Sequence, residues 1–370
     1  MSLDIRVTDS DRAHRVDLLS DGTPISWLSI IDHEVKVGSA YLRMGGIGGV
    51  GTLEEHRMKG YSRRVLEHSI DYMTKNGYDI SMLYGIPDYY SKWGYSSTLP
   101  EYKITMPLRN ARRANPGLNP RPMTNDDANR VLDIYESTNE LRTGPVRRPR
   151  GKWLRFRKGS DWRILADGTV FEDDSSQIVG YYAADRWPRV MRITEVGATE
   201  VRFYENMLGH ASKVADQRQA AELEIFVPSD HEFANLCKRM GCTFRIEYQY
   251  DAMGMGRIIN VRSTMEKLRG ELSRRLDGSG VGRFPPRLAI KTEIGSVTLK
   301  ISGSGLDVSD DTSQDWVDLP QCALMQLVLG YRTVADVLAD PAVKSQGNVY
   351  TVLGALFPAG NPYIWLSDWF

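Results

Sequence analysis

The sequence has few of the residues that disulfide frameworks and metal sites need. Its 370 residues include three cysteines (Cys237, Cys242 and Cys322) and six scattered histidines. Such a set makes neither a disulfide framework nor a metal site, so we expect no metal and a reducing cytoplasm as the setting. No run approaches the roughly 20 apolar residues that span a bilayer. The start, Met1 to Arg6, also lacks the apolar core of a signal peptide.

An excess of charge of one sign is also absent, because 47 basic residues balance 47 acidic ones. A neutral chain has no overall basic field that attracts nucleic acid, so we expect neither a nucleic-acid nor a membrane partner. With 41% hydrophobic and 25% charged residues, the composition is typical of a soluble globular protein. The length of 370 residues predicts two or three domains.

One stretch, from Gly45 to Tyr95, organises the chain. It runs from a Gly-rich strand end through a loop into a helix, and then into a second strand. That order can build an anion site, because the first turn of a helix offers unpaired N–H groups and a favourable dipole. Gly60 lets the backbone approach a phosphate closely, and Arg57 and Lys59 add positive charge nearby. Alone, this loop is a weak signal, since an ordinary basic helix start has the same composition.

Taken together, the pieces resemble the GNAT superfamily of acetyl-CoA-dependent N-acetyltransferases. The residues that match its signature are Val50, the loop Arg57-x-x-Gly60-x-Ser62 and the motif Tyr90-x-x-x-Gly94-Tyr95. Ser62 stands where the family has Gly or Ala, which narrows the space beside the phosphates but keeps the amide. The resemblance implies an α+β fold of the α/β GNAT type. Its two strands ending near Val50 and Gly85 separate to admit the pantetheine arm of the cofactor.

The resemblance also assigns acetyl-CoA, as cosubstrate, to particular residues. For the pantetheine arm these are Gly49, Val50, Gly51, Gly85 and Ile86. For the pyrophosphate they are Arg57, Met58, Lys59, Gly60, Tyr61 and Ser62. In this interpretation the backbone of Val50 and Ile86, and not their side chains, would bind the arm. The simpler interpretation of both residues is plain strand core.

Tyr90 matches the tyrosine that enzymes of this family use as general acid. The thiolate that leaves has a pKa near that of a thiol, roughly 8.5, and a phenol at about 10 can hydrogen-bond or protonate it. Tyr89 is the neighbouring alternative, but the spacing to Gly94 favours Tyr90. The stretch has no cysteine, so we expect direct attack of an amine on the thioester rather than a covalent acyl-enzyme.

The first domain is expected to cover residues 1–108. The elements predicted for it are strands at 15–20 and 25–31 joined by Asp21-Gly22, a strand at 39–52, a helix at 61–73 and strands at 79–86 and 102–106. GNAT domains place a strand and two helices before the hairpin, and those helices wall the acceptor site. Here few residues precede it, so the pocket is either more open or completed by another part of the chain.

A second pass of the same pattern starts at Pro120 and predicts a degenerate GNAT domain over residues 109–262. Its predicted elements are helices at 124–136, 201–217 and 230–240 and strands at 160–170, 176–184, 189–196 and 223–227. Cys237 to Cys242 aligns with Tyr90 to Tyr95, so Cys237 replaces the general acid. A small buried residue is a better interpretation of Cys237 than a nucleophile. Residues 142–158 hold eight basic side chains and no acidic one, which predicts a solvated loop; an anion contact is the alternative.

The last part, residues 263–370, predicts a strand meander between helices. The helices are expected at 263–276, 320–329 and 333–339, and the strands at 287–293, 295–301 and 305–307. This arrangement resembles a sterol carrier protein-like domain, whose own function would be lipid binding. The order GNAT, degenerate GNAT, sterol carrier-like resembles the Eis (enhanced intracellular survival) family of acetyltransferases over the whole chain.

The final ten residues, Asn361 to Phe370, are strongly apolar where chains usually fray. We therefore expect this tail to be buried, which would bring the terminal carboxylate with it and lift its pKa above roughly 3.5. The Eis resemblance implies that the carboxylate of Phe370 is the catalytic base, with Asp368 as a neighbour that attracts cations. A tail docked only for packing or subunit contact is the alternative.

These expectations combine into one function. The chain is expected to be an N-acetyltransferase that moves an acetyl group from acetyl-CoA to a primary amine of a cationic small molecule or a lysine side chain. The alternative is a non-catalytic CoA-sensing or lipid-binding protein. Because Eis relatives assemble as hexamers, the resemblance also implies a homo-oligomer.

Overall fold

The computed structural model describes residues 2–187, 189–303 and 305–370. Their contacts divide the chain into two units. Unit 1 consists of Met1–Leu99, Gln249–Pro362 and Phe370, and unit 2 of Pro100–Tyr248 and Tyr363–Trp369. The three-part division at residues 108 and 262 stays a prediction. No helix in the described parts of the chain combines the length and the apolar composition needed to cross a membrane.

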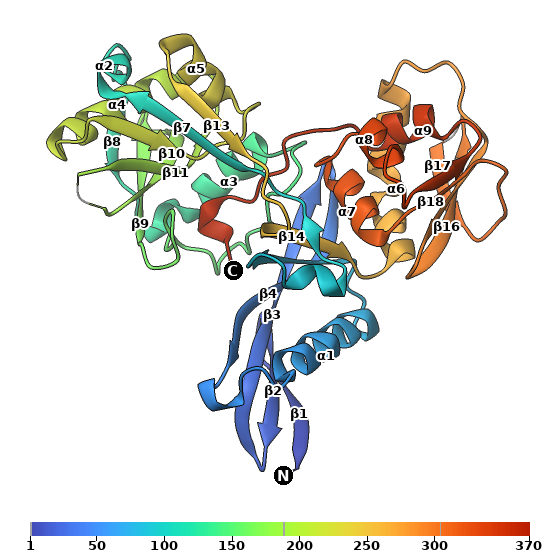
Figure 1. The fold of residues 1–370 in the computed structure, drawn as a ribbon. Helices are drawn as coiled ribbons and strands as arrows, with labels where there is room; N and C mark the ends of the chain where they lie inside the picture. Colours follow the sequence, from blue (N-terminus) through green and yellow to red (C-terminus); the bar gives the residue numbers. More distant parts are fainter. Residues whose placement is uncertain (1, 188, 304) are drawn as a thin grey trace. The chain divides into compact units, whose positions relative to one another are not determined.

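A seven-stranded sheet of order β1-β2-β3-β4-β5-β14-β6 forms the first part of unit 1 (Figure 1). Its strands are β1 (Leu3–Asp9), β2 (Ala13–Ser20), β3 (Thr23–Val37), β4 (Ala40–Thr52), β5 (Ile80–Gly85), β14 (Met253–Ile258) and β6 (Ser96–Ser97). Strands β1 to β4 are an antiparallel meander, whereas β4 and β5 run parallel. The predicted hairpin turn is confirmed, with φ of 47° at Asp21 and 86° at Gly22.

Helix α1 (Tyr61–Lys75) connects β4 to β5 and packs on this sheet (Figure 1). Its buried residues Val65, Leu66, Ser69 and Met73 recur at the three- and four-residue spacing of one helix face. Val65, Leu66 and Met73 share a core with sheet residues such as Ile30, Ile47 and Leu83. Because each large side chain buried there contributes about 1.5–3 kcal/mol, the apolar stripe fixes which face of the helix meets the sheet. The sequence predicted this helix.

One strand expected in the first sheet belongs to the second. β7 (Glu101–Pro107), predicted to close the first domain, pairs antiparallel with β12 (Glu222–Ile225) and β13 (Thr243–Glu247). In exchange β14, whose residues lie within the range 109–262 predicted for the second domain, pairs antiparallel with β5. The physical reason is that β5 and β12 offer the same kind of free antiparallel edge. Sequence order alone does not say which strand fills which edge.

Unit 2 repeats the arrangement of the first sheet, in the order β13-β7-β12-β11-β10-β9-β8. Its other strands are β8 (Asn119–Pro122), β9 (Ala166–Glu172), β10 (Ile178–Asp185) and β11 (Met191–Ala198). Strands β8 to β11 are antiparallel and β11 runs parallel to β12. Helix α4 (Phe203–Gln217) connects that parallel pair, as α1 does in unit 1. The predicted tandem GNAT folds are thus present.

Two of the remaining helices of unit 2 were predicted, α3 (Ala128–Thr138) and α5 (Glu232–Met240), whereas the short α2 (Leu108–Ala111) was not. A capping box between Thr124 and Asp127 opens the turn before α3. The strand predicted at 160–170 begins only at Ala166, because the preceding residues fold into turns closed by the bond from Gly159 N–H to Ile164 O at 2.8 Å.

The C-terminal part of unit 1 holds a five-stranded sheet of order β17-β16-β15-β18-β19. Its strands are β15 (Arg287–Thr292), β16 (Gly295–Ser302), β17 (Gly305–Ser309), β18 (Trp316–Asp318) and β19 (Lys344–Gln346). Its helices are α6 (Val261–Gly278), α7 (Gln321–Leu329), α8 (Val334–Leu338) and α9 (Val349–Leu356). Helix α6 packs on β16 and β17, whereas α7 packs on β14 and β6 of the first sheet. The three predicted helices and three predicted strands are present as α6, α7, α8, β15, β16 and β17, whereas β18, β19 and α9 were not predicted. The sterol carrier resemblance stays a prediction.

Candidate active site

The parallel strands β4 and β5 separate at their carboxyl ends. Their pairing runs from Met44 and Ile80 to Ile47 and Leu83, although β4 continues to Thr52 and β5 to Gly85. The outer edges stay occupied, because β3 pairs with β4 and β14 pairs with β5 up to these ends. The facing backbone edges between the two strands are therefore open to a ligand that can pair with them, as expected from the sequence.

A bulge shapes the β4 side of this opening. The register between β3 and β4 shifts between Trp27 and Ser29, where Gly49 adopts a φ of +60°. A glycine with positive φ is typical of such bulges, which re-aim the strand. Val50 is 37% exposed and Ile86, just past β5, is 62% exposed, so neither is the plain strand core that was the simpler interpretation. A side chain at Gly51 would meet the Trp27 ring at 2.7 Å.

The predicted anion loop ends in an uncapped helix terminus. Gly60 is the N-cap of α1 with a φ of 76° and no side-chain cap, and the first turn holds no acidic residue. The amides of Tyr61 and Ser62 lie in that first turn, where unpaired donors and the helix dipole favour an anion. Met58 is fully exposed and has a φ of 61°.

Polar contacts brace this loop from within. Arg57 Nε donates to Thr52 O at 3.4 Å, and Lys59 Nζ donates to Glu55 O at 2.9 Å. The Ser62 hydroxyl lies 2.6 Å from the Tyr89 hydroxyl. Ser62 thus connects the first turn of α1 to the residue beside the proposed acid, a link that the sequence did not predict.

Tyr90 begins a short 3-10 helix, η2 (Tyr90–Trp93), that Gly94 ends with a φ of 75°. Its side chain is 8% exposed and packs against Gly85, where an added Cβ would meet the Tyr90 ring at 2.9 Å. The ring centroids of Tyr89 and Tyr95 lie 4.9 and 6.3 Å away. Burial raises the pKa of Tyr90 to about 12, and the two neighbouring tyrosines add to this. The hydroxyl therefore stays protonated at ordinary working pH.

Phe370 lies on β4 and belongs to unit 1, although the seven residues before it belong to unit 2. A Cβ on Gly46 would meet its ring at 2.7 Å, and a Cβ on Gly48 would lie 3.2 Å from its carboxyl carbon. The rings of His33 and Tyr84 have centroids 5.3 and 5.5 Å from that of Phe370. These two side chains were missed from the sequence, because no motif marks them. Only the alternation of β3 and β5 could have placed them on one face.

Strand β5 relates the two predicted catalytic groups. Tyr84 faces Phe370, whereas the next residue, Gly85, contacts Tyr90. Successive residues of a strand point to opposite faces. Tyr90 and Phe370 therefore flank the end of β5 from its two sides.

The corresponding place in unit 2 is filled by the chain's own tail. Beyond β12, Phe226 O accepts a hydrogen bond from the Tyr363 hydroxyl at 3.0 Å, and the Ser367 hydroxyl donates to Glu195 of β11. The tail therefore crosses the ends of the parallel pair that corresponds to β4 and β5. Cys237 is fully buried, as predicted, and burial raises the pKa of its thiol above its usual range.

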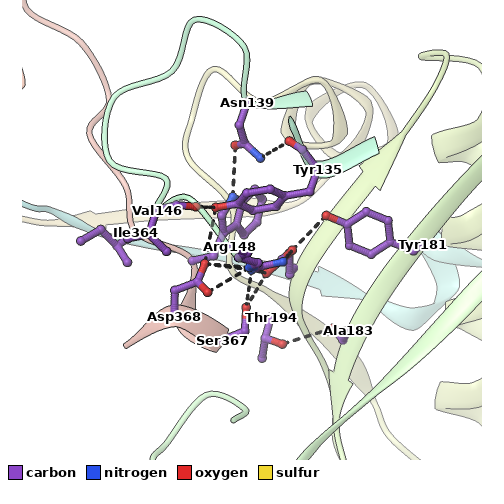
Figure 2. Close-up of polar contacts among 12 residues, drawn as sticks. Tyr135, Asn139, Val146, Arg148, Tyr181, Ala183, Thr194, Ile364, Ser367 and Asp368 are labelled. Carbon is purple, nitrogen blue, oxygen red and sulfur yellow. Dashed lines mark hydrogen bonds and ion pairs between the residues drawn. The ribbon is translucent and has the colours of Figure 1, made fainter. Parts of the chain in front are cut away.

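A buried charge cluster holds this tail (Figure 2). The Arg148 side chain is 2% exposed and donates to Glu195 at 2.8 and 2.5 Å and to Asp368 at 2.9 and 2.8 Å. Burial opposes the guanidinium charge, but Asp368 and Glu195 outweigh it and raise the pKa of Arg148 well above its usual value. One sequence interpretation is corrected here, because Arg148 is no solvated loop residue. Asp368 lies in a buried ion pair with Arg148, and its role as a neighbour that attracts cations stays a prediction.

Within the described residues, no three His, Cys, Asp or Glu side chains come together as a metal site would require. The expected absence of a metal stays a prediction.

Comparisons with known proteins agree with this geometry. Residues 11–98 match the family model described as an acetyltransferase (GNAT) domain. No protein of curated function matches the sequence. A GCN5-related N-acetyltransferase from Kribbella flavida superposes with a TM-score of 0.72 at 18% identity, covering 96% of this chain and 87% of its own.

Two further solved structures have the same fold. The GCN5-related N-acetyltransferase from Anabaena variabilis has a TM-score of 0.76 at 16% identity and covers 96% of this chain and 89% of its own. Eis1 from Mycobacterium abscessus has a TM-score of 0.67 at 15% identity, with both chains fully covered.

Residues 11–98 are therefore an acetyltransferase (GNAT) domain. Over its whole length the chain has the fold seen in Eis1. GNAT domains use acetyl-CoA in general.

Proposed function

We propose that this protein transfers the acetyl group of acetyl-CoA to a primary amine of a cationic small molecule or a lysine side chain. The observation that carries the proposal is the opening between β4 and β5 beside the uncapped N-terminus of α1. The pantetheine arm would pair with Gly49, Val50 and Gly51 on one side and with Gly85 and Ile86 on the other. The pyrophosphate would lie against residues 57–62.

The amine would attack the thioester carbon directly. Its nitrogen forms the new amide bond and gives up a proton to the carboxylate of Phe370, the last residue of the sequence. The carbon–sulfur bond breaks, and the sulfur leaves as a thiolate beside Tyr90. A phenol with a pKa of about 12 is a weaker acid than a free thiol at roughly 8.5. Tyr90 would therefore act chiefly by donating a hydrogen bond as charge develops on sulfur; the thiolate then takes a proton from the solvent, and CoA leaves as the thiol.

The acceptor class is supported by the side chains around Phe370. A carboxylate attracts an ammonium ion, and aromatic faces such as those of Tyr84 and Phe370 favour a cation near them. The resemblance to Eis-type enzymes supports the same class. Self-association, expected from that resemblance, is part of the proposal, and light scattering of the purified protein measures the subunit number.

The test is thiol release from acetyl-CoA across a panel of polyamines, aminoglycosides and lysine peptides. Tyr90→Phe should lower kcat by about 100-fold, whereas Tyr89→Phe, which loses the bond to Ser62, should act mainly on the KM for acetyl-CoA. Two glycines added after Phe370 should also lower kcat, because they displace the carboxylate. CoA binding by calorimetry without turnover would favour the CoA-sensing alternative. Lipid retained on purification without turnover would favour the lipid-binding one.

A further inference from the structure

The loop that carries Tyr90 is held by residues from far along the chain. Besides the bonds inside its short 3-10 helix, the loop is closed by the turn bond from Gly94 N–H to Ser91 O, at 2.9 Å. The Ser91 hydroxyl donates to Asp251 Oδ2 at 2.8 Å. The carbonyls of Trp93 and Gly94 are bonded by two side chains from beyond residue 256. All of these residues belong to unit 1.

Gln321, the first residue of α7, bridges the loop and strand β14. Its side-chain amide donates to Gly94 O at 2.5 Å, and its side-chain oxygen accepts from Ile258 N–H at 2.7 Å. The residue is 1% exposed. Because one end donates and the other accepts, the carboxamide can lie only one way round. A Cβ on Gly94 would meet the Gln321 amide nitrogen at 2.4 Å, so the loop approaches as closely as a glycine allows.

Arg257 of β14 makes the second contact. Its Nη1 donates to Trp93 O, and its guanidinium lies 5.8 Å from the centroid of the Tyr95 ring. It is buried, and burial lowers the pKa of Arg257 from its usual value. Glu293, between β15 and β16, accepts from the Gln321 backbone N–H at 2.8 Å. The bracing of the loop is therefore continuous with the C-terminal sheet.

We propose that Gln321 and Arg257 are positioning residues that fix the backbone of Trp93 and Gly94 and thereby aim the Tyr90 hydroxyl at the departing sulfur. This inference rests on the proposed function, because it needs Tyr90 as the hydrogen-bond donor to the departing sulfur. It gives the part of the chain after residue 256 a role in the acetyl transfer that is distinct from lipid binding.

The physical argument is that a four-residue 3-10 helix has too few internal bonds to hold one conformation. A displacement on the order of 1 Å at a reacting group can cost about 100-fold in rate. Buried carbonyls need partners, and the partners of Trp93 and Gly94 come from β14 and α7. The position of Tyr90 is thus set by residues that never touch the substrate.

A double-mutant cycle tests whether these residues act through Tyr90. In the full-length enzyme, Gln321→Met should lower kcat by about tenfold or more with little change in the KM for acetyl-CoA. In a Tyr90→Phe background the same change should lower kcat by less than about twofold, because no hydroxyl remains to be aimed. Equal losses in both backgrounds would overturn the inference and leave Gln321 a purely structural residue.

Hydrogen exchange measures the loop without relying on turnover. Gln321→Met should speed amide exchange over residues 90–95, whereas Gln326→Met should not. Gln326 is the matched control, since it lies on the same helix and donates to Ser97 O at 2.9 Å. Unchanged exchange at 90–95 in Gln321→Met would contradict the inference. If Gln321→Met exchanges faster at 90–95 but the wild-type protein shows no turnover, the bracing exists and the proposed function is wrong.

Conservative variants separate positioning from folding. Arg257→Lys keeps a donor and a charge near Trp93 O and should retain more of kcat than Arg257→Met does. If Gln321→Met does not fold, Gln321→Glu takes its place. It keeps the shape and the acceptor for Ile258 N–H but loses the obligatory donor to Gly94 O.

Discussion

Gly60 and Gly77 flank helix α1 with nearly the same backbone conformation, at φ values of 76° and 72°. Nothing lies within 4 Å of a Cβ built at either position. An alanine at either site therefore meets no neighbour but adopts a left-handed conformation that costs about 1–2 kcal/mol. The two glycines differ only in their position. Gly60 precedes the N-terminus of α1, beside the proposed pyrophosphate site, whereas Gly77 follows the C-terminus of α1.

This pair gives the first prediction. Gly60→Ala should raise the KM for acetyl-CoA about tenfold, because the altered loop no longer directs its amides at the pyrophosphate. Both Gly60→Ala and Gly77→Ala should lower the melting temperature, by similar amounts. Gly77→Ala should leave the KM for acetyl-CoA unchanged. Steady-state kinetics and thermal unfolding of both variants measure the two effects. A KM that rises equally in both would mean that the loop does not bind the cosubstrate.

The buried cluster in unit 2 gives the second prediction. Arg148→Met should destabilise unit 2 by about 3–5 kcal/mol, because it leaves the carboxylates of Glu195 and Asp368 buried without their cation. Arg150→Met is the matched control. Arg150 contacts Asp133 and Glu136 at the surface, with side chains about half exposed, and such pairs contribute about 0–1 kcal/mol. Calorimetric unfolding of the two variants distinguishes them; similar small shifts would show that the cluster is not buried as described.

The third prediction concerns acid stability. Glu271 of α6 accepts hydrogen bonds from Ser39 and from Arg274 and Arg275. Burial alone would raise the pKa of Glu271, but these bonds lower it to about 2 from its ordinary 4.5. Because the pKa of Glu271 is lower in the folded state than in the unfolded state, its ionised carboxylate stabilises the fold at pH values above its ordinary pKa. That stabilisation is lost as the pH falls through about 2.

Glu271→Gln should therefore lower the melting temperature at pH 7, and its difference from the wild type should shrink between pH 4.5 and 2. Glu266→Gln, on the same helix and in an exposed pair with Arg262, should show a small difference at every pH. A Glu271→Gln difference that is constant with pH would mean that the carboxylate is not ionised when this site is folded.

Local motifs explain how much could be predicted from the sequence. The turn at Asp21, the helix from Tyr61 and the loop at Gly60 depend on residues close together in the chain, where φ preference and helical spacing decide the structure. The tandem fold followed from the repeated order of elements. Burial of Cys237 and of the tail around Trp365 followed from their apolar surroundings.

The features that could not be predicted from the sequence depend on contacts between residues far apart in the chain. The exchange of β7 and β14 between the sheets depends on which edge each strand reaches. The Arg148 cluster joins residues more than 200 positions apart, so a run of basic residues could not reveal that one of them is buried. Gln321 is likewise an ordinary helix residue in the sequence, and only the structure places it against Gly94.

The last prediction tests the position of Phe370 by a change of size. In Gly46→Ala the new methyl group would meet the Phe370 ring at 2.7 Å and push the carboxylate aside. Since a displacement of about 1 Å can cost about 100-fold in rate, a smaller shift should lower kcat about tenfold. Phe370→Ala keeps the carboxylate and removes the ring, so adding Gly46→Ala in that background should cost little more. Amide-forming kinetics of the two single variants and the double variant measure the coupling. Full additivity of the two losses would show that Phe370 does not lie on Gly46 in the working enzyme, and the terminal carboxylate would then no longer be a candidate for the base.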